Sequence, residues 1–340
     1  MTHQRILIAT EAWHPQVNGV VRTLDTTVRT LRGWGHVVDV LEPSSFWTIP
    51  VPFYPEIRVC LPRPGRVYDR IRRFRPDDVH ISTEGPLGRL VRRYCLNRGW
   101  RFSTSYHTRF PEYLAELARV PERWSYHVLR QFHNRAGALM VATPSLQLEL
   151  KARGFTAPMC RWSRGVDLTL FRPHPHPHGD SPYPRPVLLY VGRVSAEKGI
   201  EDFLRLSTPG TKVVVGDGPA RADLERRYPA AKFLGYRKGE ALAACYAMAD
   251  LFVFPSKTDT FGLVTIEALA CGVPVAAYPV TGPKDIITHD ALGALDHDLG
   301  AAVERALRTG NRAACIAEGR SYTWENCTRQ FLENLVPVRG

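Results

Sequence analysis

The sequence contains no long apolar run. All of its apolar stretches are shorter than the ~18 to 20 residues that a membrane-spanning helix needs. Residues 1–5 lead straight into a strand-like segment and carry no signal-peptide pattern. These absences argue against a membrane-spanning protein, and we expect a cytosolic one.

Cysteine is scarce as well. The 340 residues include 7 cysteines, an odd number, and no two of them form a CxxC pair. A disulfide framework and a zinc ribbon both need suitably spaced pairs, so neither is predicted. We interpret all seven as buried, reduced thiols. They are Cys60, Cys95, Cys160, Cys245, Cys271, Cys315 and Cys327.

Composition is otherwise that of a globular protein. Hydrophobic residues make up 44% of the chain and charged residues 23%, which excludes disorder and fibrous repeats. Because domains usually have ~100 to 150 residues, a chain of 340 residues predicts two domains.

Positive charge is concentrated in the first half. Residues 1–170 carry 25 Lys and Arg against 14 Asp and Glu, or +11, whereas residues 171–340 carry 20 against 19, or +1. Arginine supplies 24 of those first 25 cations. Such a field attracts phosphates of nucleic acid or of an anionic bilayer. A merely solvated surface explains it equally well.

The first half alternates between strand-like and helix-like segments. Apolar runs at 5–10 and 37–41 predict buried parallel strands, and apolar residues spaced by three or four within 19–34 predict the helix between them. Further strands are expected at 78–82, 102–106 and 139–143, with helices at 87–98 and 121–135. The pattern predicts a Rossmann-like, doubly wound α/β domain over residues 1–170.

A second α/β pattern follows a proline-rich segment. Residues 171–186 predict a stiff linker, and strand-like runs resume from 187, so a second Rossmann-like domain is expected over 187–321. The segment 322–337 predicts a helix that can pack back on the first domain. Two such domains facing across a cleft would bind ligands at the carboxyl edges of their sheets.

The linker also carries the only regular histidine pattern. His174, His176 and His178 alternate with prolines. They can bind a metal adventitiously, but Pro-rich loops often carry histidines without function, and we predict no physiological metal site.

Two carboxylates in the second half stand out. Asp259 and Glu267 bracket the segment 259–267 (DTFGLVTIE), and along a continuous helix they would lie ~12 Å apart, too far for one catalytic dyad. With Gly262 bending the chain, Asp259 falls on a loop and Glu267 inside a helix whose N-terminus favours an anionic ligand. Ordinary surface acids explain the spacing alone.

Two cations form a second candidate site. Residues 191–199 (VGRVSAEKG) place Arg193 and Lys198 on a glycine-bounded loop after a strand, where they can hold a diphosphate. Gly216, in 216–219 (GDGP), follows the next strand. Simple loop cations are the alternative.

Candidate residues in the first half are weaker. The first strand-to-helix turn contains no GxGxxG, so a dinucleotide site is not supported, but Gly19 lets the backbone approach a phosphate or sugar. His107 follows a strand and would lie at the cleft edge, although a lone histidine is more often structural.

Together these motifs resemble the retaining nucleotide-sugar glycosyltransferases of the GT-B fold, family 4. The likeness covers essentially the whole chain and is most specific at 192–199, 216–219, 254–256 and 259–267, the last matching the family's E-x7-E position. Asp259 stands where most members have Glu. Together with the segment 15–23 (PQVNGVVRT), this is similar to the branch of GDP-mannose-dependent mannosyltransferases, sulfoquinovosyl-diacylglycerol synthases and bacterial glycolipid synthases.

The resemblance implies a role for each candidate residue. Arg193 and Lys198 would bind the donor diphosphate, and Glu267 the nucleotide ribose. Asp259 would bind the sugar hydroxyls together with the backbone of three residues, Phe261, Gly262 and Leu263. Gly19 would lie near the donor and His107 near the reacting sugar. Members need no divalent metal, in agreement with the absence of a DxD-like cluster here. The donor would be linked to UDP or GDP and carry mannose, glucose or glucuronate.

The arginine-rich half would face the acceptor. Arg72 and Arg73 add charge, and Trp124, Val128 and Phe132 recur every four residues, which predicts a helix with an apolar face suited either to an anionic membrane or to the core. We expect a peripheral enzyme on the inner face of the cytoplasmic membrane, with a lipid acceptor such as diacylglycerol. The alternatives are a soluble or polysaccharide acceptor and, in another class, a nucleic-acid-binding protein.

Overall fold

The computed structural model divides the chain into two compact units. Unit 1 comprises Met1–Ser163 and Trp324–Gly340, and unit 2 comprises Arg164–Thr323. The structure describes residues 3–16, 18–51, 54–112, 119–175 and 181–339. Within these ranges no helix is both long and apolar enough to cross a membrane.

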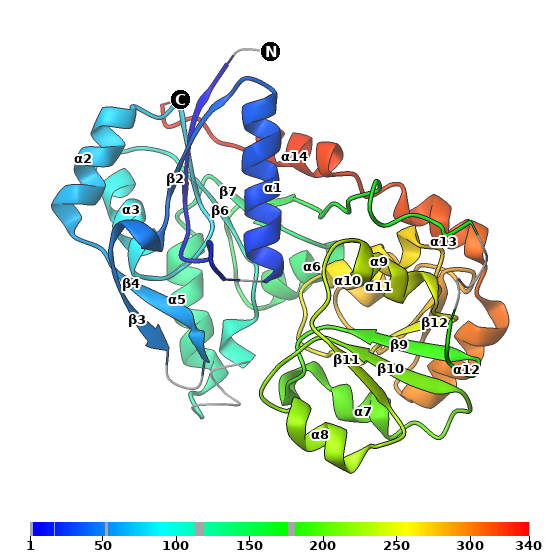
Figure 1. Cartoon of the computed structure of the whole chain (residues 1–340). Helices are drawn as coiled ribbons and strands as arrows, with labels where there is room; N and C mark the ends of the chain where they lie inside the picture. The colour runs from blue at the N-terminus through cyan, green and yellow to red at the C-terminus, as the bar shows by residue number, and fades with distance from the viewer. Residues whose placement is uncertain (1–2, 17, 52–53, 113–118, 176–180, 340) are drawn as a thin grey trace. The chain divides into compact units, whose positions relative to one another are not determined.

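Unit 1 is built on a parallel sheet of six strands in the order β2-β1-β5-β6-β7-β8 (Figure 1). Its strands are β1 (Arg5–Ala9), β2 (Val37–Leu41), β5 (Asp78–Ile81), β6 (Ser103–Ser105), β7 (Ala138–Val141) and β8 (Met159–Arg161). Its helices are α1 (Gly19–Gly33), α2 (Pro64–Phe74), α3 (Pro86–Asn97), α5 (Glu122–His133), α6 (Pro144–Ala152) and α14 (Trp324–Glu333). The strands and helices expected in the first half are confirmed, and β8 was not anticipated.

Alternation along β1 explains why helices cover both faces of this sheet. Ile6 and Ile8 pack in one cluster with Leu24 and Leu31 of α1. Leu7, between them, packs in a different cluster with residues of α2 and α3. A strand whose two faces are both apolar must be buried on both sides, as the short apolar run at 5–10 predicted.

The C-terminal helix α14 belongs to unit 1. Trp324, Thr328, Phe331 and Leu335 are all buried, and Phe331 and Trp324 share the cluster of α1. The stripe expected from the sequence is therefore the packing face of this helix.

An antiparallel hairpin was not anticipated. It consists of β3 (Trp47–Val51) and β4 (Tyr54–Leu61) and follows the short 3-10 turn Pro43–Ser45 that comes after β2. Prolines at 50 and 55 lie within its strands, and this composition conceals a strand from sequence analysis because proline is unusual in paired strands.

Unit 2 repeats the architecture with six parallel strands in the order β11-β10-β9-β12-β13-β14. The strands are β9 (Val187–Val191), β10 (Thr211–Val215), β11 (Lys232–Gly235), β12 (Leu251–Phe254), β13 (Val275–Ala277) and β14 (Gly293–Leu295). The helices are α7 (Ile200–Leu204), α8 (Arg221–Arg227), α9 (Glu240–Ala247), α10 (Leu263–Ala270), α11 (Pro283–Ile286), α12 (Leu299–Thr309) and α13 (Arg312–Gly319), with a 3-10 turn at Ala196–Lys198.

The proline-rich segment 171–186 falls inside unit 2, whose limit lies at Arg164. Phe171 is 1% exposed and packs edge-on against Tyr246, with ring centroids 5.7 Å apart, so the start of the segment is anchored in this unit. His174 lies in the described part, whereas His176 and His178 lie outside it.

Candidate active site

The candidate residues of unit 2 gather on loops at one edge of its sheet. β9, β10 and β12 are neighbouring parallel strands, so their carboxyl ends meet at the same edge. The loops 192–199, 216–220 and 255–262 follow these three ends. Two of them are tied directly, because the Thr258 hydroxyl donates to the Glu197 carbonyl oxygen at 3.2 Å.

The structure pairs Lys198 with Asp259. The Lys198 Nζ lies 2.8 Å from the Asp259 Oδ1, and both side chains are about three-quarters buried, with exposures of 21% and 25%. Lys198 comes from the loop after β9 and Asp259 from the loop after β12. A diphosphate or a sugar hydroxyl bound here would meet one donor and one acceptor side by side.

A hydrogen bond from Tyr190 holds the backbone at Arg193. The Tyr190 hydroxyl donates to the Arg193 carbonyl oxygen at 2.7 Å. Burial raises the pKa of Tyr190, and the nearby carboxylates of Asp259 and Glu197 raise it further, so the phenol stays protonated and remains a donor. The Arg193 side chain is half-buried.

Gly216 allows two loops to touch. Its φ is 141°, and a Cβ built there would overlap the Gly192 carbonyl oxygen. Any side chain would therefore push the loop after β10 away from the loop that carries Arg193.

Gly262 begins the helix that carries Glu267. Its φ is 84°, in the left-handed region, and as a glycine at the N-cap it offers no side chain to the first turn of α10. The N–H groups of that turn, which begins at Leu263, are thus suited to a polar ligand. Phe261, just before the turn, is buried at 3% exposure, so its contribution would come from the backbone.

Glu267 is buried and held by a tyrosine. It is 2% exposed, and the Tyr246 hydroxyl donates to its Oε2 at 2.9 Å. The same hydroxyl lies 3.3 Å from the Val264 carbonyl oxygen. Tyr246 comes from α9, and sequence analysis missed it because its α9 helix is apolar on all sides and gives no signal for a polar contact.

In unit 1, His107 ends a hydrogen-bonded chain of buried side chains. Its Nε2 lies 2.8 Å from the Ser105 Oγ, which lies 3.1 Å from the His80 Nε2. The His80 Nδ1 lies 2.9 Å from the Ser103 Oγ. Burial lowers the pKa of His80 to about 3, so its ring is neutral at physiological pH. His80 and both serines were not singled out from the sequence.

Gly19 is the first residue of α1 and is exposed. The Asn18 side chain caps this helix by accepting from the N–H groups of Val20 and Val21 at 3.0 and 2.9 Å. Because α1 follows β1, Gly19 lies at the carboxyl edge of the unit 1 sheet, as does His107 after β6.

The expected membrane face of α5 needs a correction. Trp124 and Val128 are exposed at 66% and 39%, but Phe132 is only 4% exposed and packs in the core of unit 1. Four residues of an α-helix make a full turn plus ~40°. Phe132 is two such steps from Trp124, so its side chain lies ~80° around the helix axis from that of Trp124. Arg72 and Arg73 are exposed on α2.

Comparison with known proteins identifies the family. Residues 17–170 match the model described as Glycosyltransferase Family 4, and residues 185–309 match Glycosyl transferases group 1. The GDP-mannose-dependent alpha-mannosyltransferase of Mycobacterium tuberculosis is 30% identical over 99% of this chain and 97% of its own length. The chain belongs to glycosyltransferase family 4.

Other members of the family are also similar. The sulfoquinovosyl transferase SQD2 of Arabidopsis thaliana is 30% identical over 82% of this chain, which spans 60% of that longer protein. The alpha-monoglucosyldiacylglycerol synthase of Streptococcus pneumoniae is 26% identical over 89% of this chain and 78% of its own length. This family 4 chain is therefore a nucleotide-sugar-dependent, retaining hexosyltransferase, and the nucleic-acid-binding alternative is set aside.

Solved structures show the GT-B fold. Sucrose-phosphate synthase from Thermosynechococcus elongatus superposes with a TM-score of 0.75 at 22% identity, covering 96% of this chain and 97% of that one. Anabaena HepE, in complex with UDP and glucose, superposes with a TM-score of 0.70 at 18% identity, covering 97% and 99%. The expected fold, two doubly wound domains of the GT-B class, is confirmed.

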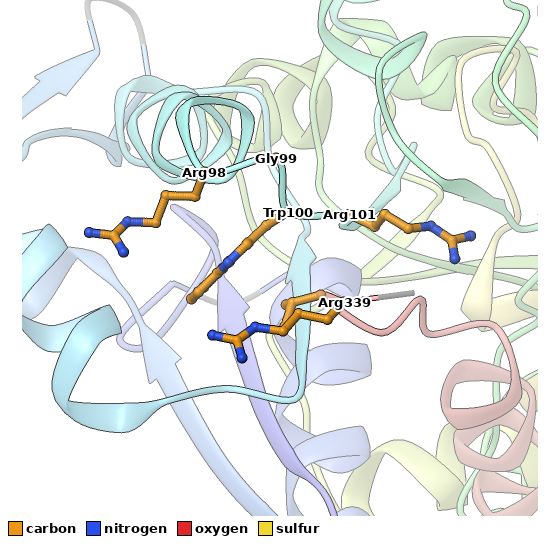
Figure 2. A pocket seen from close by; sticks show the side chains of 6 residues that line it. Arg98, Gly99, Trp100, Arg101 and Arg339 are labelled. Carbon is orange, nitrogen blue, oxygen red and sulfur yellow. The ribbon is translucent and has the colours of Figure 1, made fainter.

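Unit 1 of this family 4 enzyme also contains a hollow, at the edge of its sheet opposite to that of Gly19 and His107. A hollow of about 450 Å³ is lined by Arg98, Gly99, Trp100, Arg101, Val338 and Arg339, with the Trp100 side chain between those of Arg98 and Arg339 (Figure 2). The Arg101 N–H donates to the Val338 carbonyl oxygen, which places the hollow where β6 begins, at the amino edge. No predicted site residue lines it. In the described ranges no cluster of His, Cys, Asp and Glu is arranged to hold a metal ion.

Proposed function

We propose that the enzyme transfers a hexose or hexuronic acid from a UDP- or GDP-linked donor to a membrane lipid such as diacylglycerol, giving an α-glycolipid. The observation that carries the proposal is the pairing at 2.8 Å of Lys198 with Asp259, which lies on the loop that leads into α10 and its buried Glu267. The cation matches the diphosphate of a nucleotide sugar, the Asp259 carboxylate matches the sugar hydroxyls, and the Glu267 carboxylate matches the ribose hydroxyls.

Unit 2 would hold the donor. Lys198 and Arg193 would bind the diphosphate, the first as a point charge and the second through its planar fork. Asp259 would accept hydrogen bonds from the sugar, with backbone groups of 261–263 beside it. Glu267, held by Tyr246, would accept hydrogen bonds from the ribose hydroxyls.

The chemistry would be a same-face substitution at the anomeric carbon. The bond between that carbon and the diphosphate oxygen breaks through an oxocarbenium-like transition state, while Lys198 and Arg193 stabilise the charge that develops on the diphosphate. The acceptor hydroxyl attacks from the face that the diphosphate leaves, and its proton passes to a phosphate oxygen. No protein base is required, and His107 would contact the reacting sugar.

Two observations support a lipid acceptor. The pneumococcal relative is named for synthesis of a glucosylated diacylglycerol. The first 170 residues carry a charge of +11, concentrated in arginines such as Arg72 and Arg73, which favours an anionic membrane surface. Trp124 on α5 adds an exposed aromatic side chain of the kind enriched at membrane interfaces. The enzyme would thus act peripherally on the inner face of the cytoplasmic membrane.

A soluble or polysaccharide acceptor remains the second candidate. The mycobacterial relative, similar over nearly its full length, is named as a mannosyltransferase that depends on GDP-mannose. That similarity favours GDP-mannose among the donors to be tested first, and it does not require a lipid.

One assay separates the two candidates. Purified enzyme would be incubated with radiolabelled UDP-glucose, UDP-glucuronate, UDP-mannose, GDP-mannose or GDP-glucose and either a total lipid extract or a water-soluble glycan mixture. The proposal predicts label in the organic phase, with an α-anomeric product by NMR. Label only in the aqueous product would favour the soluble acceptor, and a β-anomeric product would contradict the proposed mechanism.

A further inference from the structure

The β3–β4 hairpin of unit 1 has one face against the protein core. Thr48 lies opposite Cys60 in the register of the hairpin. Cys60 is 0% exposed and belongs to the core cluster that also contains Val67 and Ile71 of α2. Since opposite residues point to the same side of a two-stranded ribbon, the side of Thr48 and Cys60 is the inner face.

The other face is apolar and uncovered. Trp47 lies opposite Leu61, and Ile49 lies opposite Val59. Side chains alternate along a strand, so all four occupy the outer face. Trp47 is 81% exposed, Ile49 53% and Leu61 48%. The outer face of a hairpin in water is usually polar, so three large apolar side chains there indicate a surface that something else covers.

The hairpin lies on the same side of unit 1 as its candidate active-site residues. β3 follows the turn Pro43–Ser45, which comes directly after the carboxyl end of β2. Gly19 and His107 also follow carboxyl ends of strands in this sheet. Figure 1 shows the hairpin extending from this edge, beside α2.

Exposed arginines follow the hairpin directly in the chain. Residues 63–75 contain six arginines and one acid, Asp69. Arg63 and Arg66, which follow Leu61 closely in the chain, are exposed. The Arg70 Nη1 donates to the Ser45 Oγ at 3.2 Å, which ties α2 to the base of the hairpin. A hollow of about 580 Å³ lies at this junction, lined by Ser45 and Phe46 and by charged residues of both signs, among them Arg66, Arg73, Asp39 and Asp69.

We propose that this outer face, Trp47, Ile49 and Leu61, together with Arg63 and Arg66, docks the enzyme on an anionic lipid bilayer. The apolar side chains enter the boundary between headgroups and acyl chains, and the arginines bind lipid phosphates. Charge selects the bilayer over a second copy of the chain, because two such faces would bring like-charged arginines together. The inference rests on the proposed function, because docking on the bilayer would bring a lipid acceptor to the active-site side of unit 1.

Vesicle binding tests the surface without donor or acceptor. Sedimentation would compare vesicles of phosphatidylcholine alone with vesicles that also contain phosphatidylglycerol. We expect binding only to the anionic vesicles, weaker at higher salt. We expect two double variants to bind at least tenfold more weakly: Trp47→Ser with Ile49→Ser, and Arg63→Gln with Arg66→Gln. In the arginine variant, the loss of each interfacial cation alone changes affinity about fivefold.

A matched control separates the hairpin from apolar exposure in general. Leu148 on α6 is 68% exposed, so Leu148→Ser removes a comparable apolar side chain and should bind vesicles as the unsubstituted enzyme does. All the substituted positions are exposed, so the variants should fold, which circular dichroism and the melting temperature check.

Several outcomes would overturn the inference: equal binding to neutral vesicles, unchanged binding of both hairpin variants, or a dimer that Trp47→Ser dissolves in the absence of lipid. If hairpin variants bind normally while lipid is still glycosylated, the docking surface is wrong and the proposed function stands. If the hairpin is needed for vesicle binding but no lipid is glycosylated, the docking surface stands and the proposed acceptor is wrong.

Discussion

The ammonium of Lys198 lies 2.8 Å from the carboxylate of Asp259, although 61 residues separate them in the chain. The pair joins the loop after β9 to the loop after β12 at the carboxyl edge of the unit 2 sheet. About a quarter of each side chain is exposed, so solvent screens the pair in part and we expect it to contribute only ~1 kcal/mol to stability. Its importance is therefore expected in ligand binding.

Replacement of Asp259 should separate activity from stability. Asp259→Asn keeps the shape but loses the charged acceptor that we propose for the sugar hydroxyls, so we expect kcat/KM to fall at least tenfold with little change in melting temperature. Asp259→Glu restores the carboxylate and should recover most of the activity. Asp223→Asn breaks a similar pair with Arg226, at 3.0 Å on exposed α8, and should have no effect. Steady-state kinetics with the donor varied check this, and equal loss in the Asn and Glu variants would count against the role of the charge.

The hydroxyl of Tyr246 should matter for donor affinity. Tyr246→Phe removes the 2.9 Å hydrogen bond to Glu267 and leaves the ring in place. A hydrogen bond to a charged group contributes ~1.5 to 3 kcal/mol, so we expect the donor KM to rise about tenfold while kcat changes less.

The matched control for this prediction is Tyr228→Phe. Its hydroxyl donates to Glu201 of α7 at the same distance, 2.9 Å, but neither residue is a candidate for donor binding. Tyr228→Phe should leave the donor KM unchanged. A similar rise in both variants would assign the effect to general loosening of unit 2.

Ser105 should orient His107. The Val79 carbonyl oxygen, 3.5 Å from the Ser103 Oγ, favours a chain in which His80 donates to Ser103, Ser105 donates to His80, and His107 donates through Nε2 to Ser105. Ser105→Ala removes the acceptor for the Nε2–H group of His107. The tautomer protonated at Nε2 should then no longer be favoured, and kcat should fall several-fold.

Nitrogen-15 NMR of the histidine rings measures that tautomer directly. Thr104→Val is the control, because the Thr104 hydroxyl lies 3.0 Å from the His133 Nδ1, outside the chain that leads to His107. The prediction fails if His107 keeps the same tautomer in Ser105→Ala, even when activity falls.

Asp78 should make stability depend on pH. It is 1% exposed, and neither carboxylate oxygen has a hydrogen-bond partner among the described residues. Burial, and secondarily the charge of Asp77, raises its pKa from 3.8 to about 6. A raised pKa means that the folded state holds the proton longer, so this group's contribution to stability falls as pH rises from about 4 to about 6.

Asp78→Asn should remove that dependence. We expect the variant to gain about 2 kcal/mol relative to the unsubstituted protein at pH 7, after allowance for solvent screening, and no comparable gain near pH 4. Urea unfolding at the two pH values measures the difference. Asp290→Asn, an exposed control, should show none. A gain that is the same at both pH values would rule out titration of Asp78 as the cause.

The sequence predicted the elements better than the contacts between them. Short apolar runs such as 5–10 and 187–191 must be buried on both faces, and this alone identifies parallel strands. Glycine-bounded loops after those strands identified the candidate residues. The pairing of Lys198 with Asp259 was not predictable, because it depends on how two loops meet in space.

Other features could not be predicted from the sequence, for different reasons. Tyr246 and Ser105 each contact a candidate residue through a single hydroxyl, and a lone hydroxyl has no sequence pattern. Phe132 was grouped with Trp124 and Val128 on one apolar face, suited either to a membrane or to the core. Residues spaced by four shift steadily around a helix, and only the packing shows that Phe132 is buried while the other two are exposed. The β3–β4 hairpin, with prolines in its strands, lacks the usual signal of a strand.

The most direct test of the account concerns the two cations of unit 2. We expect Lys198→Ala and Arg193→Ala each to lower kcat/KM at least tenfold, because each removes a group that we propose stabilises the departing diphosphate. Lys232→Ala, which removes an exposed lysine at the opposite edge of the same sheet, should leave kcat/KM unchanged. Isothermal titration with the nucleoside diphosphate should show the same weakening in the first two variants. Activity and diphosphate binding close to those of the unsubstituted enzyme in folded Lys198→Ala and Arg193→Ala would contradict the account.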